Sequence, residues 1–373
     1  MTDCGSRLWI FVIGGAQRGG AEGQFVRLAS RLRQAGEPVE CVFLFGGGPL
    51  LDELVRADVP HHVLRDVHHR SRALRAMSLA LAVGRLAVLL RHRRPTVVMT
   101  WLTFATWPTL LLAEFLTSAS RIAGIRGEIL PTEVRWATGL FRRALRRAHA
   151  VVVNSEALVD EATAWGALAG KVRVIPNGVD LPHRVSDPDS DGAVVLANYR
   201  PYKGHADLLR ALTLCRSDVR VNLCGFGEAQ RQVEELAVAL NVRDRVHFVE
   251  QPADVPAELA LAGFAIHPSH TEGLSNAILE EMAAGLPVVA MAVGGNPMLV
   301  QPGTNGYLLD VGDHPALARA IDDLALSPGL RRRLGAGSRE RVKQFTWETC
   351  ADRYQELLSR LEEREDRREA GAR

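Results

Sequence analysis

The chain has 373 residues, 47% of them hydrophobic, and its 45 Lys and Arg nearly balance its 43 Asp and Glu, for a formal net charge of +2. This length and apolar content allow two sizeable cores, since a domain takes about 100 to 200 residues. The five cysteines have no paired spacing, so they suggest neither a disulfide framework nor a zinc site and fit a reducing cytoplasm; they are Cys4, Cys41, Cys215, Cys224 and Cys350.

Charge is spread unevenly along the chain. Residues 1–182 hold 23 Lys or Arg against 15 Asp or Glu, a balance of +8, whereas the remainder holds 22 against 28, a balance of −6. The first 15 residues contain only a short apolar run that leads directly into strand-like sequence, which argues against a cleaved signal peptide.

The first half of the chain alternates strand-like runs with helical segments as far as Leu181. This alternation predicts βαβ units and a parallel sheet in a first domain over residues 1–182. The strand-like runs are Trp9 to Ile13, Cys41 to Phe45, Val97 to Thr100, Val151 to Val153 and Val172 to Ile175.

Four glycines follow the first strand, at Gly14, Gly15, Gly19 and Gly20, and a helix is expected directly after them. Glycines let the backbone approach a ligand closely, although an ordinary tight turn between strand and helix has the same composition. A dinucleotide fingerprint does not fit, because the spacing is not G-x-G-x-x-G and Glu40 precedes its strand.

The stretch from Val97 to Leu116 is near the length needed to cross a bilayer and carries one charge, Glu114. Its first residues, VVMTW, are typical of a strand, and Pro108 suits the first turn of a helix. We therefore expect a buried strand, a loop and a helix rather than a membrane span.

A helix predicted from Val134 to Ala148 is amphipathic. Its apolar side carries Ala137, Leu140, Phe141, Ala144, Leu145 and Ala148. The arginines of its other side and of the preceding sequence are Arg142, Arg143, Arg146 and Arg147, with Arg70, Arg72, Arg75, Arg91, Arg93 and Arg94. They predict a cationic face for an anionic membrane surface or a pyrophosphate-linked acceptor, with a solvated cover on the sheet as the alternative. No aromatic residues are interleaved with them, so nucleic acid is not expected as a partner.

The polar, turn-forming segment PHRVSDPDSDG predicts an interdomain linker over residues 183–192. Asp187, Asp189 and Asp191 form Asp-x-Asp units of the kind that bind Mg²⁺ or Mn²⁺. Their place in a Pro-bearing linker, away from a strand end, favours a solvated spacer, and we expect no metal.

A second alternation of strands and helices predicts a second domain over residues 193–345. Its strand-like runs are Ala193 to Leu196, Val219 to Cys224, Val246 to Val249, Phe264 to Ile266 and Pro287 to Ala290. Two doubly wound sheets place a ligand at the carboxyl ends of their strands. An amphipathic helix is expected over 346–366, and the charged tail 367–373 is expected to be disordered.

Lys203 and Arg200 lie in the segment RPYKG, at the end of the first strand of the second domain. Two cations there could neutralise the charge that develops on a departing nucleoside diphosphate, although a solvated basic turn is the simpler interpretation. His205 is expected to start the next helix rather than to act in catalysis.

Two carboxylates, Glu272 and Glu280, stand with seven residues between them in the segment HPSHTEGLSNAILEEMAAGLPVVA. Glu272 is placed in a loop, and Ser275 is predicted to cap a helix that ends at Gly285. The free N–H groups of the first helical turn make a seat for an anion. A capped helix with an exposed Glu is also ordinary in α/β proteins. Loop histidines such as His267 and His270 are expected to be solvated.

From HPSHTEG through PVVA the segment resembles the C-terminal signature of retaining GT-B glycosyltransferases of family 4. The resemblance continues, in the family's order, over GGAQRGGAEGQFVRLASRLRQAG, VVVNSEAL, VRVIPNGVD, RPYKG and LCGFGEAQ. It implies an α/β GT-B fold, with two doubly wound Rossmann-like domains facing a central cleft and a C-terminal helix that packs back on the first domain.

The resemblance also implies roles for single residues. Glu272 would contact the donor sugar and Glu280 the nucleotide ribose, and the loop with Gly19 and Gly20 would lie over the donor diphosphate. The remaining donor-site residues by this resemblance are Asn198, Gly273, Leu274, Ser275 and Asn276.

Two positions depart from the family pattern. Asn198 stands where members commonly carry an Arg, so Arg200 is expected to supply that charge. A first-domain His that often contacts the donor sugar is absent, and Phe104 occupies the aligned region. Arg126 is the nearest polar substitute, with a structural ion pair to Glu128 or Glu133 as the alternative.

The sequence thus predicts a cytoplasmic, metal-independent, cofactor-free retaining glycosyltransferase, peripheral at the inner face of the membrane. It would move a sugar from a nucleotide-diphosphate donor, with UDP favoured, to a hydroxyl of a bacterial polysaccharide, lipid-linked glycan or glycoconjugate. Front-face attack is the mechanism that the resemblance implies. A soluble natural-product acceptor, a GT-B-fold nucleotide-sugar epimerase and a non-catalytic sugar-nucleotide binder are the alternatives.

Overall fold

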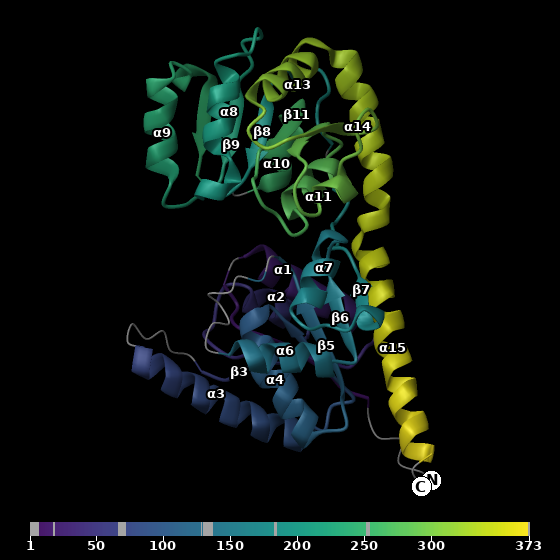
Figure 1. The fold of residues 1–373 in the computed structure, drawn as a ribbon. Helices are drawn as coiled ribbons and strands as arrows, with labels where there is room; N and C mark the ends of the chain where they lie inside the picture. The colour runs from purple at the N-terminus through teal and green to yellow at the C-terminus, as the bar shows by residue number, and fades with distance from the viewer. Residues whose placement is uncertain are drawn as a thin grey trace. The chain divides into compact units, whose positions relative to one another are not determined.

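The computed structural model describes residues 7–17, 19–65, 72–127, 129, 137–182, 185–250 and 254–371. The chain divides into two units (Figure 1): unit 1 comprises Met1–Gly178 with Trp347–Arg373, and unit 2 comprises Val179–Thr346. Each unit is a parallel sheet with helices on both faces, as the alternation predicts. Within the ranges just given, no helix combines the length and the apolar character that a membrane span needs.

Unit 1 is built on a seven-stranded sheet in the order β3-β2-β1-β4-β5-β6-β7. Its strands are β1 (Trp9–Ile13), β2 (Val39–Phe43), β3 (His61–Val63), β4 (Val97–Trp101), β5 (Ser120–Ile125), β6 (Ala150–Val153) and β7 (Val172–Val174). Its helices are α1 (Gly20–Gln34), α2 (Leu51–Arg56), α3 (Arg72–Arg93), α4 (Thr103–Leu116), α6 (Thr138–Arg147), α7 (Ala157–Ala164), the short η1 (Ala169–Lys171) and α15 (Trp347–Gly371).

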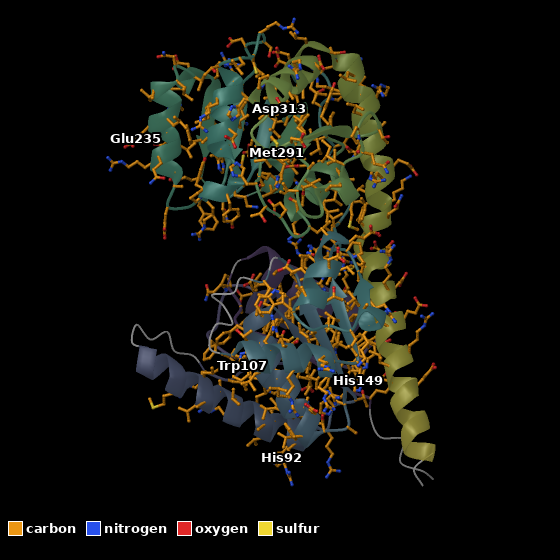
Figure 2. The ribbon with its side chains drawn as sticks, in the orientation of Figure 1. His92, Trp107, His149, Glu235, Met291 and Asp313 are labelled. Carbon is orange, nitrogen blue, oxygen red and sulfur yellow. The ribbon has the colours of Figure 1, made fainter. Side chains whose placement is uncertain are left out.

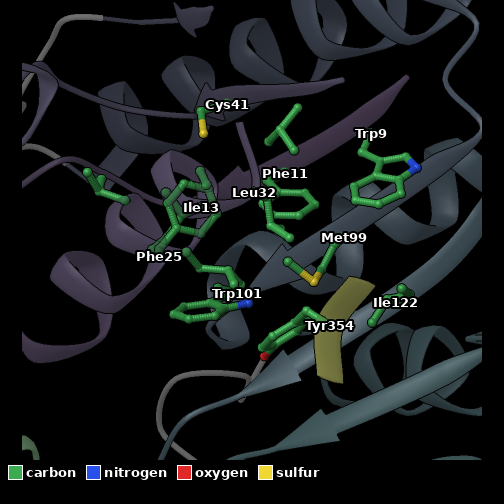
Figure 3. Close-up of a cluster of buried hydrophobic side chains, with 14 of the residues drawn as sticks. Trp9, Phe11, Ile13, Phe25, Leu32, Cys41, Met99, Trp101, Ile122 and Tyr354 are labelled. Carbon is green, nitrogen blue, oxygen red and sulfur yellow. The ribbon is translucent and has the colours of Figure 1, made fainter. Parts of the chain in front are cut away.

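Alternating side chains along β1 create the two apolar faces of this sheet. Trp9 and Phe11 belong to one buried cluster, and Ile10 and Val12 belong to the other, because successive strand residues point to opposite faces. The first face packs against α1, α2 and α15, and the second packs against α3, α4, α6 and α7. Figure 3 shows Tyr354 of α15 within the first cluster, so the C-terminal helix packs on unit 1 as expected.

Unit 2 is built on a six-stranded sheet in the order β10-β9-β8-β11-β12-β13. Its strands are β8 (Ala193–Leu196), β9 (Val221–Cys224), β10 (Val246–Val249), β11 (Phe264–His267), β12 (Val288–Met291) and β13 (Gly306–Leu309). Its helices are η2 (Pro201–Lys203), α8 (His205–Leu212), α9 (Gln230–Ala239), η3 (Arg243–Arg245), α10 (Val255–Ala260), α11 (Asn276–Ala283), α12 (Asn296–Leu299), α13 (His314–Leu326), α14 (Pro328–Val342) and η4 (Lys343–Phe345).

The boundary between the units differs from the expected linker at 183–192. Gly178 ends the first part of unit 1, where its carbonyl accepts a hydrogen bond from Gln24 Nε2 at 2.8 Å. Beyond it, the described residues of the expected linker belong to unit 2. The backbone N–H of Ser186 bonds to Ala284 O at 2.8 Å, and Arg331 Nε bonds to Pro188 O at 2.9 Å. The polar composition indicated solvation, whereas a buried arginine satisfies the backbone oxygens of this segment.

The structure also differs in how β4 meets α4. The helix begins at Thr103, so only Leu102 separates it from the strand, and Pro108 lies inside the helix rather than in its first turn. Leu102 adopts a positive φ of 67°, an uncommon conformation for a leucine that makes the sharp junction possible. The strands β3, β5 and β13 were not among the expected runs.

Two helices depart in detail from their predictions. Leu140 of α6 is 43% exposed, although the helix pattern placed it on the apolar side; its neighbours Phe141, Ala144 and Leu145 are buried as predicted. Helix α15 runs to Gly371, so 367–371 are helical rather than disordered. Its final turns are rich in Glu and Arg, which are good helix formers that also pair three and four residues apart.

The strand order of each sheet reverses direction at one point. In unit 1 the reversal lies between β1 and β4, and in unit 2 it lies between β8 and β11. The loops that leave neighbouring strands on the two sides of such a point diverge and leave room for a ligand. In unit 2 those loops carry Lys203 and Glu272, and in unit 1 the loop after β1 carries the four glycines.

Candidate active site

Lys203 and Glu272 meet beside the reversal point of unit 2. Lys203 follows β8 and Glu272 follows β11, and their side chains form an ion pair with an Nζ–Oε1 distance of 2.5 Å. The side chains are only 19% and 12% exposed, so water screens their attraction weakly. The two predicted residues, 69 positions apart in the chain, therefore form one charged unit.

Two glycines permit this approach. Gly204 has a φ of 71°, and a Cβ at this position would collide with the carbonyl oxygen of Pro268. Gly294 has a φ of 50°, and a Cβ there would collide with the carbonyl oxygen of Glu272. Both positions need a residue without a side chain, because the backbone is left-handed and the neighbouring loop is in contact.

His267, at the end of β11, contacts the side chain of Glu272. Its side chain is 1% exposed, and Nε2 lies 2.9 Å from Glu272 Oε1 and 3.2 Å from the hydroxyls of Ser269 and Ser275. The expectation of a solvated loop histidine is wrong for this residue. His267 is the last residue of β11, and its imidazole is buried where it contacts Ser269, Glu272 and Ser275.

These partners control the charge of Glu272. Burial works to raise the pKa of its carboxyl, but the hydrogen bond and charge of His267 and the charge of Lys203 outweigh burial and lower the pKa to about 2. Glu272 is therefore a carboxylate at neutral pH, able to accept hydrogen bonds from a sugar hydroxyl but unsuited to donate a proton.

Asp207 ties the loop of Glu272 to the start of α8. His270 Nε2 lies 2.5 Å from Asp207 Oδ2, and His314 Nε2 lies 2.9 Å from Asp207 Oδ1. The backbone N–H of His270 also bonds to Tyr202 O at 2.7 Å. Burial tends to raise the pKa of Asp207, but the two histidines lower it below its usual value. His270 is 41% exposed, so it is partly solvated as expected, yet it also fixes the loop.

Sequence reasoning did not single out Asp207. An acidic residue in the first turn of a helix normally indicates only a favourable interaction with the helix dipole. Its two histidine partners come from elements far along the chain, so nothing local marks the cluster. His205, by contrast, starts α8 as predicted, and burial lowers its pKa to about 4.

The N-terminus of α11 opens beside this pair. Ser275 caps the helix as predicted, with Oγ accepting a hydrogen bond from Ile278 N at 3.3 Å. The helix then begins at Asn276. Because the first N–H groups of a helix point outward and carry partial positive charge, this end can bind an anion.

The other residues predicted for the donor site lie on the loop after Glu272 and on α11. Gly273 O accepts a hydrogen bond from Gly295 N at 2.7 Å, which holds the backbone before the cap. Leu274 is buried at 5% exposure. Glu280 is half-buried and lies one turn into α11 from Asn276. Lys203 thus contacts Glu272, and Gly273, Leu274, Ser275 and Asn276 follow Glu272 directly in the chain, with Glu280 one helical turn after Asn276.

Arg200 and Asn198 lie on the loop after β8 but outside this network. Both are exposed, and the guanidinium of Arg200 makes no hydrogen bond or ion pair to any residue that the structure describes. Asn198 Oδ1 instead accepts a hydrogen bond from Phe226 N at 3.5 Å, in the loop that follows β9. Arg200 is thus a cation available at the edge of the site, and Asn198 links two of its loops.

The glycine loop of unit 1 packs closely on its neighbour. Gly19 is the N-cap of α1 with an extended backbone, and Gly20 begins the helix. A Cβ on Gly15 would lie 3.2 Å from Phe45 O, and Gln17 Nε2 bonds to Gly47 O at 3.0 Å. Gly15 therefore permits close approach between two loops at the carboxyl edge of this sheet, whereas a Cβ on Gly14 would meet nothing within 4 Å.

Arg126 lies at the same edge of unit 1, just after β5. Its guanidinium carbon is 3.8 Å from the ring centre of Trp101, and Nη1 bonds to Ile175 O and Asn177 Oδ1 at 3.3 and 3.4 Å. Its Nε and Nη2 atoms are buried without a hydrogen-bond partner in the described part of the chain. Burial lowers the pKa of this guanidinium to about 9, which leaves it charged at neutral pH. Glu128 and Glu133, its alternative partners, lie outside the described residues.

Glu281 is a buried acid that the sequence reading passed over. Its side chain is 0% exposed, and neither carboxyl oxygen has a hydrogen-bond partner among the residues described. Burial, reinforced by the charges of Glu280 and Glu272, raises its pKa well above the usual value. Glu281 therefore keeps its proton to a higher pH than an exposed glutamate does. The only signal in the sequence was its position, one residue after Glu280.

No group of three or more His, Cys, Asp or Glu side chains within the described ranges is arranged to hold a metal ion. Asp187 Oδ1 accepts a hydrogen bond from Asp189 N at 2.9 Å, and Asp189 pairs with Arg332. All three aspartates are exposed, as a solvated spacer requires, and Asp189 in addition pairs with Arg332 of α14. Metal independence itself stays a prediction.

Comparison with known proteins assigns the chain to a family. Residues 183–341 match the model described as Glycosyl transferases group 1, and residues 18–182 match Glycosyltransferase Family 4. The GDP-mannose-dependent alpha-(1-6)-phosphatidylinositol monomannoside mannosyltransferase of Mycolicibacterium smegmatis is 32% identical over 275 residues, covering 64% of this chain and 72% of that protein. The chain belongs to this glycosyltransferase family. This confirms the resemblance seen in the sequence.

Other relatives of this glycosyltransferase are similar over nearly its whole length. The lipopolysaccharide core biosynthesis glycosyltransferase LpsE of Rhizobium meliloti is 29% identical and covers 91% of this chain and 96% of LpsE. HepE of Anabaena, solved in complex with UDP, has a TM-score of 0.81 at 22% identity over 94% of this chain and 99% of that one. The structural likeness shows the GT-B fold.

Proposed function

We propose that this glycosyltransferase moves a sugar from a nucleotide-diphosphate donor to a hydroxyl acceptor with retention of the anomeric configuration. The observation that carries the proposal is the Lys203–Glu272 ion pair, placed at the reversal point of unit 2 beside the N-terminus of α11. A cation and a helix N-terminus suit a diphosphate, and a carboxylate suits sugar hydroxyls.

The departing diphosphate gains negative charge as the sugar leaves. Lys203, Arg200 and the first N–H groups of α11 stabilise that charge. Because the charge develops in the transition state, stabilising it lowers the barrier to reaction. Glu272, ionised and held by His267, orients the sugar. Glu280 contacts the ribose. Front-face attack then uses a phosphate oxygen to take the acceptor proton, in keeping with a Glu272 that does not donate protons.

Unit 1 supplies the remaining donor contacts in this proposal. Gly19 and Gly20 bring backbone N–H groups of α1 toward the diphosphate. Arg126 takes the place of the family's histidine, because two of its nitrogens are buried without a partner among the described residues and its charge has no carboxylate beside it there. An unpaired buried cation is costly, and an anionic or hydroxyl-bearing ligand relieves that cost.

The donor base is proposed to be uracil. HepE was solved with UDP and with UDP-glucose, which makes UDP the first donor to test. The Mycolicibacterium smegmatis relative is named as GDP-mannose-dependent, so GDP-sugars form the second arm. No metal is expected in either case.

The acceptor is proposed to belong to a bacterial polysaccharide, a lipid-linked glycan or a glycoconjugate. LpsE is named for lipopolysaccharide core biosynthesis, and the Mycolicibacterium smegmatis relative for a phosphatidylinositol monomannoside. Such acceptors place the enzyme in the cytoplasm at the inner face of the membrane. A soluble natural-product acceptor is the alternative.

A screen of nucleotide sugars tests the donor side. Each UDP- and GDP-sugar is added to the protein, and the melting temperature is followed, because a ligand that binds only the folded state raises it by mass action. The hit is then used for transfer, and NMR of the product gives the anomeric configuration. An inverted product contradicts retention. Epimerised donor without transfer identifies an epimerase, and binding without either reaction identifies a binder.

A further inference from the structure

We propose that α3 is a membrane-docking helix whose solvent-facing side rests on an anionic lipid surface. The proposal rests on the proposed membrane-linked acceptor for its purpose, but its evidence is separate. It assigns the apolar contact with lipid to α3, whereas the sequence pattern predicted only a cationic face, made of the arginines of α6 and of the sequence before it. Both helices cover the same face of the sheet.

The solvent face of α3 is apolar. Met77, Leu81 and Val88 are 51%, 46% and 57% exposed, and Ala80 and Gly84 are exposed between them. Residues spaced by three and four positions lie on one side of a helix. Surface helices of water-soluble proteins normally carry charged residues there, and an exposed apolar stripe of this kind marks an interaction surface.

The opposite side of α3 already has a partner. Ala82, Leu86 and Leu90 are fully buried and belong to the cluster between the sheet and α4. The helix is thus held on unit 1 by its buried side. Its apolar outer side is not needed for that packing. Met77, Leu81 and Val88 face away from a core that is complete without them.

The charges of α3 select an anionic partner. The helix contains no Asp or Glu over its 22 residues, whereas it contains five arginines and one histidine. Arg91 and His92 are exposed at its far end, where Figure 2 labels His92. Arg93 forms an ion pair with the buried Glu40, so its charge is already neutralised within the protein. The exposed Arg85 and Arg91 beside the apolar stripe, on a helix without any acidic residue, fit the boundary between headgroups and acyl chains of an anionic bilayer.

The course of the chain shows how docking through α3 would bring a lipid-linked acceptor to the site. The helix follows β3 and precedes β4, so its first half, with Met77 and Leu81, lies toward the carboxyl edge of the sheet. That edge also carries the glycine loop and Arg126. A lipid surface touching α3 therefore holds a lipid-linked hydroxyl near the catalytic edge of unit 1.

Vesicle co-sedimentation tests the proposal without donor or acceptor. The probes are vesicles of phosphatidylglycerol with phosphatidylcholine and vesicles of phosphatidylcholine alone. The test variant changes Met77, Leu81 and Val88 to Ser. The matched control changes three equally exposed apolar residues of unit 2, Leu214, Val238 and Leu261, to Ser. We expect the affinity for anionic vesicles to fall at least about tenfold in the test variant and to stay unchanged in the control.

Three outcomes overturn the proposal: no binding of the wild-type protein to anionic vesicles, equal binding to neutral vesicles, or equal losses in both variants. Sedimentation velocity supplies a fourth. If the wild-type protein is a dimer in solution and the α3 variant is a monomer, this face is an interface between copies. UDP release from the donor, measured without vesicles, should be the same in both variants. Vesicle binding without any transfer activity contradicts the proposed function but not α3 docking, and transfer without vesicle binding does the reverse.

Discussion

At the scale of single residues, the proposed chemistry depends most on the Lys203–Glu272 pair. Replacing either residue with Ala should lower kcat by about a hundredfold or more, because each acts on charge or geometry that the transition state needs. Steady-state kinetics with the donor found in the screen gives the measurement. Circular dichroism should show that both variants fold.

A matched control exists at the junction of α14 and η4. Lys343 and Glu340 form an ion pair with the same 2.5 Å distance, but their side chains are 61% and 75% exposed. Replacing either with Ala should leave kcat unchanged, since an exposed pair contributes little and lies outside the site. Near-normal turnover of the Lys203 and Glu272 variants would contradict the assignment of these residues to the active site.

Glu281 predicts a particular dependence of stability on pH. Its pKa in the folded protein lies well above the usual value, so the folded state binds a proton that the unfolded state releases above about pH 4.5. Its contribution to stability is therefore lost as pH rises from that value toward the folded pKa. Glu281→Gln removes this dependence. The Tm of the variant minus that of the wild type should grow as the pH rises above about 4.5, as differential scanning calorimetry can measure. A constant difference contradicts a raised pKa for Glu281.

At the scale of elements, the turn between β8 and α8 depends on Gly204. In Gly204→Ala the left-handed backbone is strained, and the new methyl group collides with Pro268 O. We expect a loss of about 2 kcal/mol or more in the free energy of unfolding, with a fall in kcat because Lys203 moves. Gly303→Ala separates the two effects, since Gly303 has a φ of 76° but open space around it. Denaturant unfolding should show a smaller loss in that variant, and equal losses would mean that contact with Pro268 is unimportant.

Helix α6 carries the second test of membrane binding. Its four arginines are exposed, but Arg143 and Arg147 lie 3.6 and 3.7 Å from Glu114, which offsets part of their charge. Changing the arginines at 142, 143, 146 and 147 to Gln should weaken binding to anionic vesicles and make it less sensitive to salt, because screening acts over about 10 Å.

The control for α6 is a variant of equal charge change in unit 2, with Arg216, Arg220, Arg231 and Arg243 changed to Gln. It should bind vesicles like the wild-type protein. If the α6 variant is also unaltered, the helix is a solvated cover on the sheet.

At the scale of the whole molecule, activity should survive chelation by EDTA. Lys203, Arg200 and the N–H groups of α11 are proposed to neutralise the diphosphate in place of a divalent ion. Transfer is measured before and after EDTA treatment, and again after Mg²⁺ or Mn²⁺ is restored. Complete loss on chelation with recovery on adding the ion would require a metal-binding residue set that this proposal lacks.

Much of the fold could be predicted from the sequence because its signals are local. β1, β8 and β10 occur at the predicted residues, since runs of Val, Ile and Phe between turn-forming residues need no distant partner to be recognised. The helix cap at Ser275 could be predicted for the same reason, because the signal for an N-cap is also local. Pro108 was misplaced because its helix starts from a strained Leu102, a conformation that no local preference announces.

The sequence by itself determined the two α/β units, the family and the residues Lys203, Glu272 and Ser275, since turn chemistry and spacing carry that information. Only the tertiary structure decided which loops meet. The strand order puts β8 beside β11, so Lys203 contacts Glu272, and His267 and Asp207 acquire their partners. It also decided protonation, because the pKa values of Glu272 and Glu281 move in opposite directions with their surroundings. Burial and distances between charges belong to the folded chain, and neither can be read along its sequence.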